Sequence, residues 1–360
     1  MRNRIIILFT AILSIGFFQA NAQDALFSQF YANPLYLNPA MAGTNVCPRV
    51  AFNFRDQWPA ASGTFMTYTA SYDEHFDKLS GGIGVLLFGD RAGEGGCINT
   101  YNASFMYSFK VKVAKKFNLR LALQATYQNK SLDWNKLTFG DMIDPKYGFV
   151  YQTNEQQPGK LSRSSFDMSA GLLGYTPHVY FGMAAHHITR PYQGFLVQSG
   201  SDAPEARLPV KWTAHVGAYF DLKRKSKKET SFGDISISPN FIYEHQMCFN
   251  YFNEGFYLNF YPFTVGAWLR HGLTYRNKEE EISTYNLDAF IVMFGIEYNW
   301  FKIGYSYDVT ISQLANVTGG SHEVSLQLLL PCPNKKQALK DLKCPSFSLS
   351  NTFQKFNKRK

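Results

Sequence analysis

The residues of this sequence with the most specific chemistry are its five cysteines, because an N-terminal export sequence, described below, predicts an oxidising compartment. We expect a disulfide between Cys332 and Cys344, which would close a small loop near the C-terminus. A Cys97–Cys248 bridge is expected only if the fold brings those two together, and free thiols are the alternative throughout. Cys47, Cys332 and Cys344 are expected on the periplasmic side, and Cys97 and Cys248 at the outer end. No two cysteines have the close spacing of a zinc ligand set, so we expect no metal site.

Histidine and serine motifs give no sign of catalysis. His186 and His187 are adjacent, and on a strand their side chains would point to opposite faces, so they could not easily share one metal ion. His322 and Glu323 lack the second histidine of a zinc-protease helix. The sequence contains no G-x-S-x-G elbow, phosphate loop or dinucleotide fingerprint. We therefore predict no catalytic and no cofactor-binding residues, and no enzyme.

Residues 1–22 are predicted to be a secretory signal peptide. Arg2 and Arg4 precede an apolar stretch, and Ala20-Asn21-Ala22 provides the small residues of a cleavage site. The mature chain is then expected to begin at Gln23. The alternative is a retained membrane anchor, for which the apolar stretch is short.

From residue 49 to residue 330 the sequence alternates between apolar and polar side chains. The clearest segment places Tyr101, Phe105 and Phe109 on one face and Asn102, Ser104 and Ser108 on the other. The whole chain is 45% hydrophobic and 16% aromatic with a mean hydropathy of −0.23, as interleaving would give. A period of two residues predicts strands with two chemically different faces. Soluble β-sandwiches also alternate, so the period alone does not place the sheet in a membrane.

The alternating stretch divides into about fourteen segments that we interpret as strands. They lie near residues 49–56, 65–75, 80–90, 97–110, 117–131, 163–173, 177–187, 210–223, 232–246, 248–259, 262–276, 284–298, 300–310 and 321–330. Long connections, such as 132–162 and 188–209, follow odd-numbered segments, whereas most connections after even-numbered segments are tight. Short turns at one end and long loops at the other are typical of outer-membrane barrels.

We therefore predict an all-β fold, a transmembrane antiparallel β-barrel of about 14 strands in outer-membrane lipid. Closure would satisfy every backbone donor and acceptor within the bilayer and leave no open sheet edge. Because such a chain starts in the periplasm, the short turns and both termini are expected to lie on the periplasmic side.

Two segments flank the predicted barrel. Residues 23–48 do not alternate, and their Asn-Pro pairs predict an irregular, turn-rich segment that plugs the barrel or docks a partner, with a flexible leader as the alternative. The candidate partner-binding residues in this segment are Asn33, Pro34, Asn38, Pro39 and Gly43.

Residues 331–360 form a basic tail that holds the excess positive charge of the mature chain, while residues 23–330 are balanced. The tail is interpreted either as a solvated extension or as a contact with an acidic partner or anionic lipid. The candidate contact residues are Lys335, Lys336, Lys340 and Lys343. A neutral exported body with a basic tail does not predict a partner that is a nucleic acid.

Six motifs resemble one known family. They are QDALFSQFY at 23–31, NPLYLNPAMAG at 33–43, FRDQWP at 54–59, SYD at 71–73, GGIG at 81–84 and GSHEVSL at 320–326. With these motifs the chain resembles the PorP/SprF family of type IX secretion and gliding-motility outer-membrane proteins of the Bacteroidota. The resemblance extends over essentially the whole mature chain, and its N-terminal block is the most specific part.

The resemblance implies a barrel that works with type IX secretion components, either by assisting cargo such as large adhesins to the surface or by linking the outer membrane to periplasmic parts of the machinery. The alternative, suggested by a polar inner face, is a passive porin or a transporter of hydrophobic solutes. The tail departs from the simplest barrel plan, because the chain continues for thirty residues after the predicted last strand.

Overall fold

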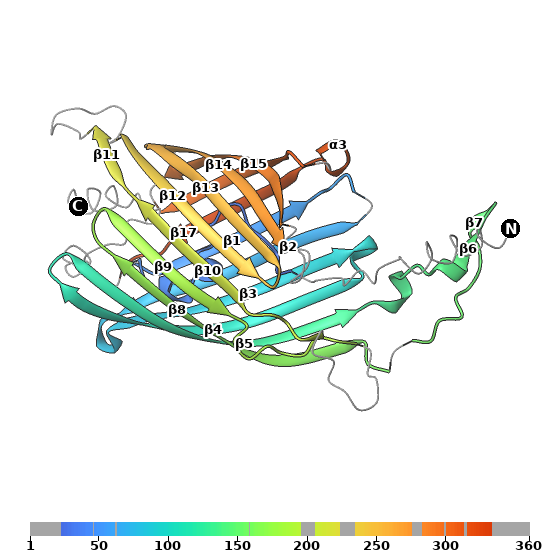
Figure 1. Ribbon diagram of the computed structural model, residues 1–360. Helices are drawn as coiled ribbons and strands as arrows, with labels where there is room; N and C mark the ends of the chain where they lie inside the picture. The colour runs from blue at the N-terminus through green and yellow to red at the C-terminus, as the bar shows by residue number, and fades with distance from the viewer. Residues whose placement is uncertain are drawn as a thin grey trace.

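The chain folds into a single β-barrel, seen from the side in Figure 1. The computed structural model describes residues 23–45, 47–61, 63–157, 159–195, 206–223, 235–275, 283–298, 300–312 and 315–332. The predicted signal peptide, 1–22, and tail residues 333–360 lie outside the described residues, and so do Lys335, Lys336, Lys340, Lys343 and Cys344.

Antiparallel strands form the barrel wall, and each pairs with its neighbour along the sequence. They are β1 (Arg49–Gln57), β2 (Thr64–Phe76), β3 (Gly81–Gly93), β4 (Ile98–Ala114), β5 (Phe117–Leu132), β8 (Ser162–Tyr175), β9 (Val179–His186), β10 (Lys211–Ala218), β11 (Phe220–Lys223), β12 (Ile235–Gln246), β13 (Phe249–Phe260), β14 (Phe263–Tyr275), β15 (Ser283–Tyr298), β16 (Phe301–Thr310) and β17 (Ser321–Leu329). Only Tyr219 separates β10 from β11, and both pair with β12, so together they act as one strand. β1 pairs with β17, and the barrel is closed with 14 strands, as predicted.

The helical elements are short. The 23–48 segment contains α2 (Pro34–Leu37) and the 3-10 helix η1 (Pro39–Met41). The connections contain α3 (Ala315–Thr318) and the 3-10 turns η2 (Asp77–Leu79), η3 (Glu94–Gly96), η4 (Trp134–Lys136) and η5 (Gly140–Met142). A small hairpin of β6 (Ile143–Asp144) and β7 (Gly148–Phe149) projects away from the barrel, at the right of Figure 1. Among the described residues, no helix has the length and apolar character needed to cross a membrane.

The two ends of the barrel differ in their connections. At one end, which we call the turn end, the chain enters β1, leaves β17 and makes the connections 77–80, 115–116, 176–178, 261–262 and 299–300. At the other, the loop end, lie the longer connections from β1 to β2, β5 to β8, β9 to β10 and β16 to β17, together with the short connections 94–97 and 247–248. The long described connections gather at the loop end, as the sequence predicts, and the short connections 94–97 and 247–248 are the exceptions at that end.

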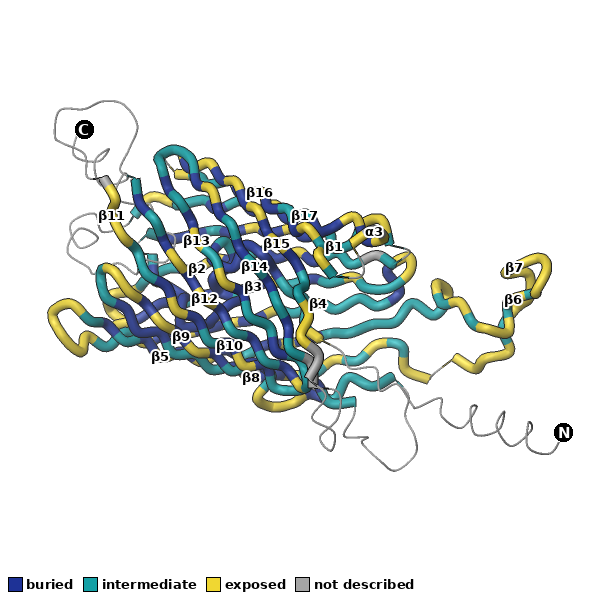
Figure 2. The backbone as a smooth tube through the Cα atoms, turned by 45° about the horizontal axis from the view of Figure 1, so that its top comes forward, coloured by how far each residue is buried: buried dark blue, intermediate teal, exposed yellow. Residues whose placement is uncertain are grey.

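The two faces of the wall differ as the alternation predicts. On β4 and β5, Phe105 and Leu123 point outward and are 54% and 63% exposed, while Ser104 and Gln124 point inward and are buried. Figure 2 shows this change between buried and exposed positions along the strands. An apolar outer wall and a polar inner wall suit a barrel that closes in lipid, because all ladder hydrogen bonds are internal.

Residues 23–48, which we call the lumenal segment, run through the barrel from one end to the other (blue inside the barrel in Figure 1). Asp24 bonds with Gln246 and His187 at the loop end, and Gly43 is held by Asp73 near the turn end. The expectation that both termini lie on one side is therefore wrong for the described residues, because Gln23 and Leu329 lie at opposite ends of the barrel.

The structure also corrects the expected disulfide. Cys332 is bonded to Cys47, with the two Cα atoms 4.5 Å apart, so it does not pair with Cys344. The physical reason is barrel closure: Arg49 lies opposite Leu329, which brings the residues just before β1 beside those just after β17. Cys97 and Cys248 are both free thiols.

We predict that peptide mapping of the unreduced protein recovers Cys47 linked to Cys332. Replacement of either residue by serine should abolish this linked peptide, because each is the other's only partner in the structure's described part. The matched control is Cys344→Ser, which should leave the Cys47–Cys332 peptide at its wild-type yield. Recovery of Cys332 linked to Cys344 would contradict the structure.

Candidate functional site

The lumenal segment and the inward side chains that hold it form the candidate functional site. Its residues are among the most buried in the chain, with Leu35, Asn38, Ala40 and Ala42 each 0% exposed. A 26-residue stretch without regular long helices or strands cannot satisfy its own backbone groups, so the wall must supply partners. These partners lie at three levels between the loop end and the turn end.

At the loop end the segment begins with an ion-paired histidine. His187, just after β9, places its Nε2 atom 2.8 Å from Oδ2 of Asp24 and its Nδ1 atom 2.7 Å from Oδ2 of Asp167. The backbone N–H of Asp24 donates to Oε1 of Gln246 at 3.0 Å. One imidazole thus joins the start of the lumenal segment to the wall strand β8.

The two carboxylates determine the charge of this histidine. Burial opposes the positive charge on His187, but Asp24 and Asp167 outweigh it and raise its pKa to about 10. Burial likewise opposes the negative charge of Asp24, and the neighbouring His187 nevertheless holds the pKa of its carboxyl below the ordinary value. Near neutral pH the contact is therefore a doubly ion-paired imidazolium, with both ring N–H groups donating.

Further along, the segment is held by four charged groups around Ser28, which we call the Ser28 cluster. The Ser28 hydroxyl donates to Oδ2 of Asp308 at 2.6 Å and accepts from the guanidinium groups of Arg55 at 2.7 Å and Arg270 at 2.9 Å. The backbone N–H of Ser28 donates to Oε2 of Glu323 at 2.7 Å.

The charges of the Ser28 cluster balance one another. Arg55 lies 2.8 Å from Asp308 and 3.3 Å from Glu323, and these side chains are at most 2% exposed. Arg270 lies 3.3 Å from Asp308. Buried charges are tolerated only when paired and hydrogen-bonded. Ser28 completes this pairing, so the segment and the wall satisfy each other.

Next to the Ser28 cluster, the neighbouring residues of the segment enter an aromatic layer. Phe30 packs on Trp268 with ring centroids 5.1 Å apart, and Tyr31 makes edge contacts with Tyr180 at 5.6 Å and Tyr257 at 6.4 Å. These residues belong to one buried cluster that crosses the lumen. Burial of Phe30 alone is worth about 1.5–3 kcal/mol.

The Asn-Pro pairs shape the segment locally. Pro34 begins α2 and Pro39 begins η1, positions at which the missing proline N–H costs no helical hydrogen bond. The Asn38 side chain caps η1 by accepting from the N–H of Ala40 at 2.9 Å, and its Nδ2 donates to the carbonyl of Leu172 at 3.0 Å. Asn38 thereby ends one helix, starts the next and fixes both to β8.

Near the turn end, two arginines hold the last part of the segment. Arg120 donates to the carbonyl oxygens of Ala42 at 2.8 Å and Gly43 at 2.6 Å. The N–H of Gly43 donates to Oδ2 of Asp73 at 2.8 Å, and Oδ1 of Asp73 accepts from Nε of Arg49, also at 2.8 Å. Carbonyls and an amide of the segment are thus bound by charged groups, which makes these hydrogen bonds strong.

Glycine is required where the segment passes the wall. Gly43 has a φ of +66°, and a Cβ atom there would lie 2.5 Å from the Cα of Gly82. A Cβ at Gly82 would lie 2.4 Å from the carbonyl oxygen of Ala42. Only a pair of glycines permits this approach of two backbones.

The predicted partner-binding residues of the 23–48 segment all lie inside the barrel. Asn33, Pro34, Asn38, Pro39 and Gly43 are buried against the wall, and the structure gives them a role in positioning the segment. The lysines of the tail lie outside the described residues. In the described part of the chain, no group of three or more His, Cys, Asp or Glu residues is placed to hold a metal ion.

Sequence reasoning missed the wall residues that hold the segment, including the charged ones. Arg55, Asp73, Gly82, Glu323 and Ser325 nevertheless come from the motifs FRDQWP, SYD, GGIG and GSHEVSL. Each of these motifs provides a contact to residues 28–43. One signal could have identified the charged ones: they occupy inward strand positions, where most other residues are neutral.

The lumen is not filled completely. A cavity of about 360 Å³ lies beside the segment towards the loop end, lined by residues that include Tyr36, Asp90, Lys130 and Lys211. Its lining mixes aromatic, acidic and basic side chains.

The sequence matches the family described as type IX secretion system membrane protein PorP/SprF over residues 19–328. Comparison with curated protein sequences gives no significant match. Among solved structures, the barrel is similar to the CymD monoaromatic hydrocarbon channel, with a TM-score of 0.41, 10% identity, and coverage of 86% of this chain and 95% of that one. It is also similar to CdiB from Acinetobacter baumannii, with a TM-score of 0.43, 9% identity, and coverage of 78% and 60%. A Pseudomonas aeruginosa FadL homologue gives a TM-score of 0.36, 12% identity, and coverage of 82% and 95%. At these identities the likeness concerns the fold alone.

We predict that Arg55→Ala releases the lumenal segment. Removal of Arg55 leaves Glu323 without its arginine and Asp308 with Arg270 alone, and we expect the free energy of unfolding in detergent to fall by about 3–5 kcal/mol. Limited proteolysis should then cut within residues 23–45 while the barrel core survives. The matched control is Arg91→Ala on the outer face of β3, which should change stability by no more than about 0.5 kcal/mol. A protease-resistant segment in Arg55→Ala would show that the Ser28 cluster does not hold it.

The His187 contact should make the free energy of unfolding depend on pH between about 6.5 and 10. Because the folded pKa, about 10, lies above the ordinary value of 6.5, the contribution is fully present below about pH 6.5. It should then decline by up to about 1.4 kcal/mol per pH unit until about pH 10. We expect the stability difference between wild type and His187→Gln to follow this decline in urea titrations. His178→Gln, in an exposed turn, is the control, and a difference that is constant from pH 6 to pH 10 would refute the ion pairing.

Proposed function

Because the chain belongs to the PorP/SprF family of type IX secretion system membrane proteins, we propose that it is a plugged, non-enzymatic outer-membrane barrel that assists the export or surface display of cargo proteins such as large adhesins. A second form of the same role is a link between the outer membrane and periplasmic components of the machinery. In both forms the barrel serves as an anchored platform, and its lumen is not the route of the cargo.

The observation that carries this proposal is that residues of the barrel wall bind the lumenal segment along its length. A passive channel needs a continuous aqueous path, whereas here the segment is bound at the loop end, at the Ser28 cluster and near the turn end. Its aromatic residues also pack in a cluster that crosses the lumen. A segment held by buried ion pairs at several levels is suited to a permanent structural role.

The basic tail is the proposed contact with the machinery. Its start is fixed at the turn end by the Cys47–Cys332 disulfide. With the turn end towards the periplasm, Lys335, Lys336, Lys340 and Lys343 would face periplasmic proteins and the inner leaflet. Clustered lysines favour an acidic protein surface or anionic lipid head groups.

The second candidate function is passive transport of small solutes. The cavity of about 360 Å³ favours it, because it is large enough for a small molecule and lined by polar and aromatic side chains. Passage would require the lumenal segment to leave its sites, which makes this the weaker candidate.

We predict that deletion of the gene leaves type IX cargo inside the cell and that the wild-type gene restores surface display. A variant that ends at residue 334 retains the disulfide and the barrel, and we expect it to reduce surface cargo to the level of the deletion strain because the lysines are lost. The measurement is surface labelling of cargo against total cargo, with barrel abundance in the membrane as the control. Normal display in the deletion strain would refute the role in secretion.

Conductance measurements on the purified protein test the transport alternative. Purified wild-type barrels in planar bilayers should be non-conducting because the segment occupies the lumen. Steady single-channel conductance of the wild type, together with normal cargo display in the deletion strain, would establish the transport function in place of the proposed one.

A further inference from the structure

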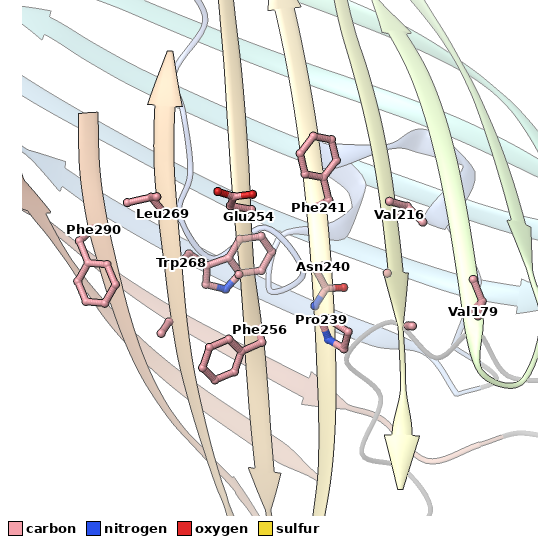
Figure 3. Close-up of a pocket in the computed structure, with 14 residues that line it drawn as sticks. Val179, Val216, Pro239, Asn240, Phe241, Glu254, Phe256, Trp268, Leu269 and Phe290 are labelled. Atoms are coloured by element: carbon pink, nitrogen blue, oxygen red, sulfur yellow. The ribbon is translucent and has the colours of Figure 1, made fainter. Parts of the chain in front are cut away.

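The outer wall carries a groove on strands β9, β10 and β12 to β15, shown in Figure 3. Its volume is about 610 Å³. It exists because Ala218, Pro239 and Ala267 present little side chain outward, while Phe241 and Phe256 rise on either side. Pro239 also lies where the β10 ladder is interrupted, between the pairs Gly217 with Asn240 and Phe220 with Ile237.

One acidic side chain stands in this apolar groove. Glu254 of β13 points outward and is exposed, with Phe241 on one neighbouring strand and Leu269 on the other. Along β13 itself, the outward positions on either side of it are Phe252 and Phe256. The carboxylate therefore has apolar side chains on all four sides of the outer wall, and three of them, Phe241, Leu269 and Phe256, are labelled in Figure 3.

Glu254 has no ion pair or hydrogen bond with any residue that the structure describes. Other outward acids, such as Asp56 and Glu74, lie within three residues of a strand end, where a polar interface is near. An ionisable group within the hydrocarbon region is unfavourable unless a partner compensates it. A lipid-facing wall without a partner gains nothing from a glutamate at this position.

We propose that this groove binds the membrane-embedded wall of a different protein, and that a lysine or arginine on that partner meets Glu254. Charge complementarity carries the argument, because the groove offers an apolar surface with one negative charge. A two-fold symmetric contact between two copies of this groove does not fit: the outward mid-strand residues of the described strands around the groove are apolar, and Glu254 would face apolar groups or another Glu254. Burial of the ion pair between two barrels would exclude lipid and make the contact specific.

The inference depends on the proposed function only through the place of the barrel in the membrane. It does not depend on the tail or the lumenal segment, which act at other parts of the molecule. A strain that displays cargo normally could therefore still lack the lateral contact. A strain that fails to display cargo could likewise still form it.

The test compares native complexes and isolated barrels. Native electrophoresis of membranes extracted in mild detergent should show the wild-type chain in a species larger than its monomer and different in mass from its dimer. Glu254→Leu and Ala267→Trp should each reduce this species at least tenfold, because the first removes the charge and the second fills the groove. The matched controls are Glu74→Leu and Ala70→Trp, which make the same changes elsewhere on the outer wall and should leave the species unchanged.

A second readout separates partner binding from a folding defect. For the isolated barrel in lipid bilayers, Glu254→Leu should raise the denaturant midpoint, because an uncompensated carboxylate facing lipid has been removed. Loss of the complex with a gain in barrel stability supports the proposal. It is overturned if the wild type is only monomeric or dimeric, if Glu254→Leu leaves the complex intact, or if Glu254→Leu lowers the midpoint.

Discussion

The pairing of two arginines with two carboxylates inside the lumen is the interaction on which the rest of this structure depends. Arg55, Arg270, Asp308 and Glu323 come from β1, β14, β16 and β17, and they meet around the hydroxyl and amide of Ser28. In an interior shielded from water, none of these charges would be tolerated alone. Their mutual compensation joins strands far apart in sequence, and it also creates the polar binding site for the segment that runs through the barrel.

Closure of the barrel provides the second constraint. Because β1 pairs with β17, the first and last parts of the chain form one side of the lumen, and the motifs near both ends come together there. Arg55 and Glu323 are an example: they lie 268 positions apart in sequence and bind the same serine residue. The same closure brings Cys47 beside Cys332.

Much of the wall could be predicted from sequence, because alternation with a period of two residues is imposed by the strand itself and needs no knowledge of neighbours. The predicted strand 117–131, for example, differs from β5 by a single residue. What could not be predicted was anything that depends on distance across the lumen. The path of residues 23–48, the partner of Cys332 and the role of Asp24 are of this kind, since each depends on which inward side chains face each other. The Cys47–Cys332 pair could have been predicted, because barrel closure implies that the residues before the first strand lie beside those after the last.

The course of the lumenal segment has a consequence for biogenesis. Its first residues lie at the loop end, and it leads directly into β1 at the turn end, so the wall encircles it over its whole length. Bulky groups such as Phe30 and Tyr31, together with the charged Asp24, would have to slide past paired arginines if they were inserted afterwards. The segment is therefore best laid down while the β1–β17 seam is still open, in which case it acts as an internal template around which the final strands wrap.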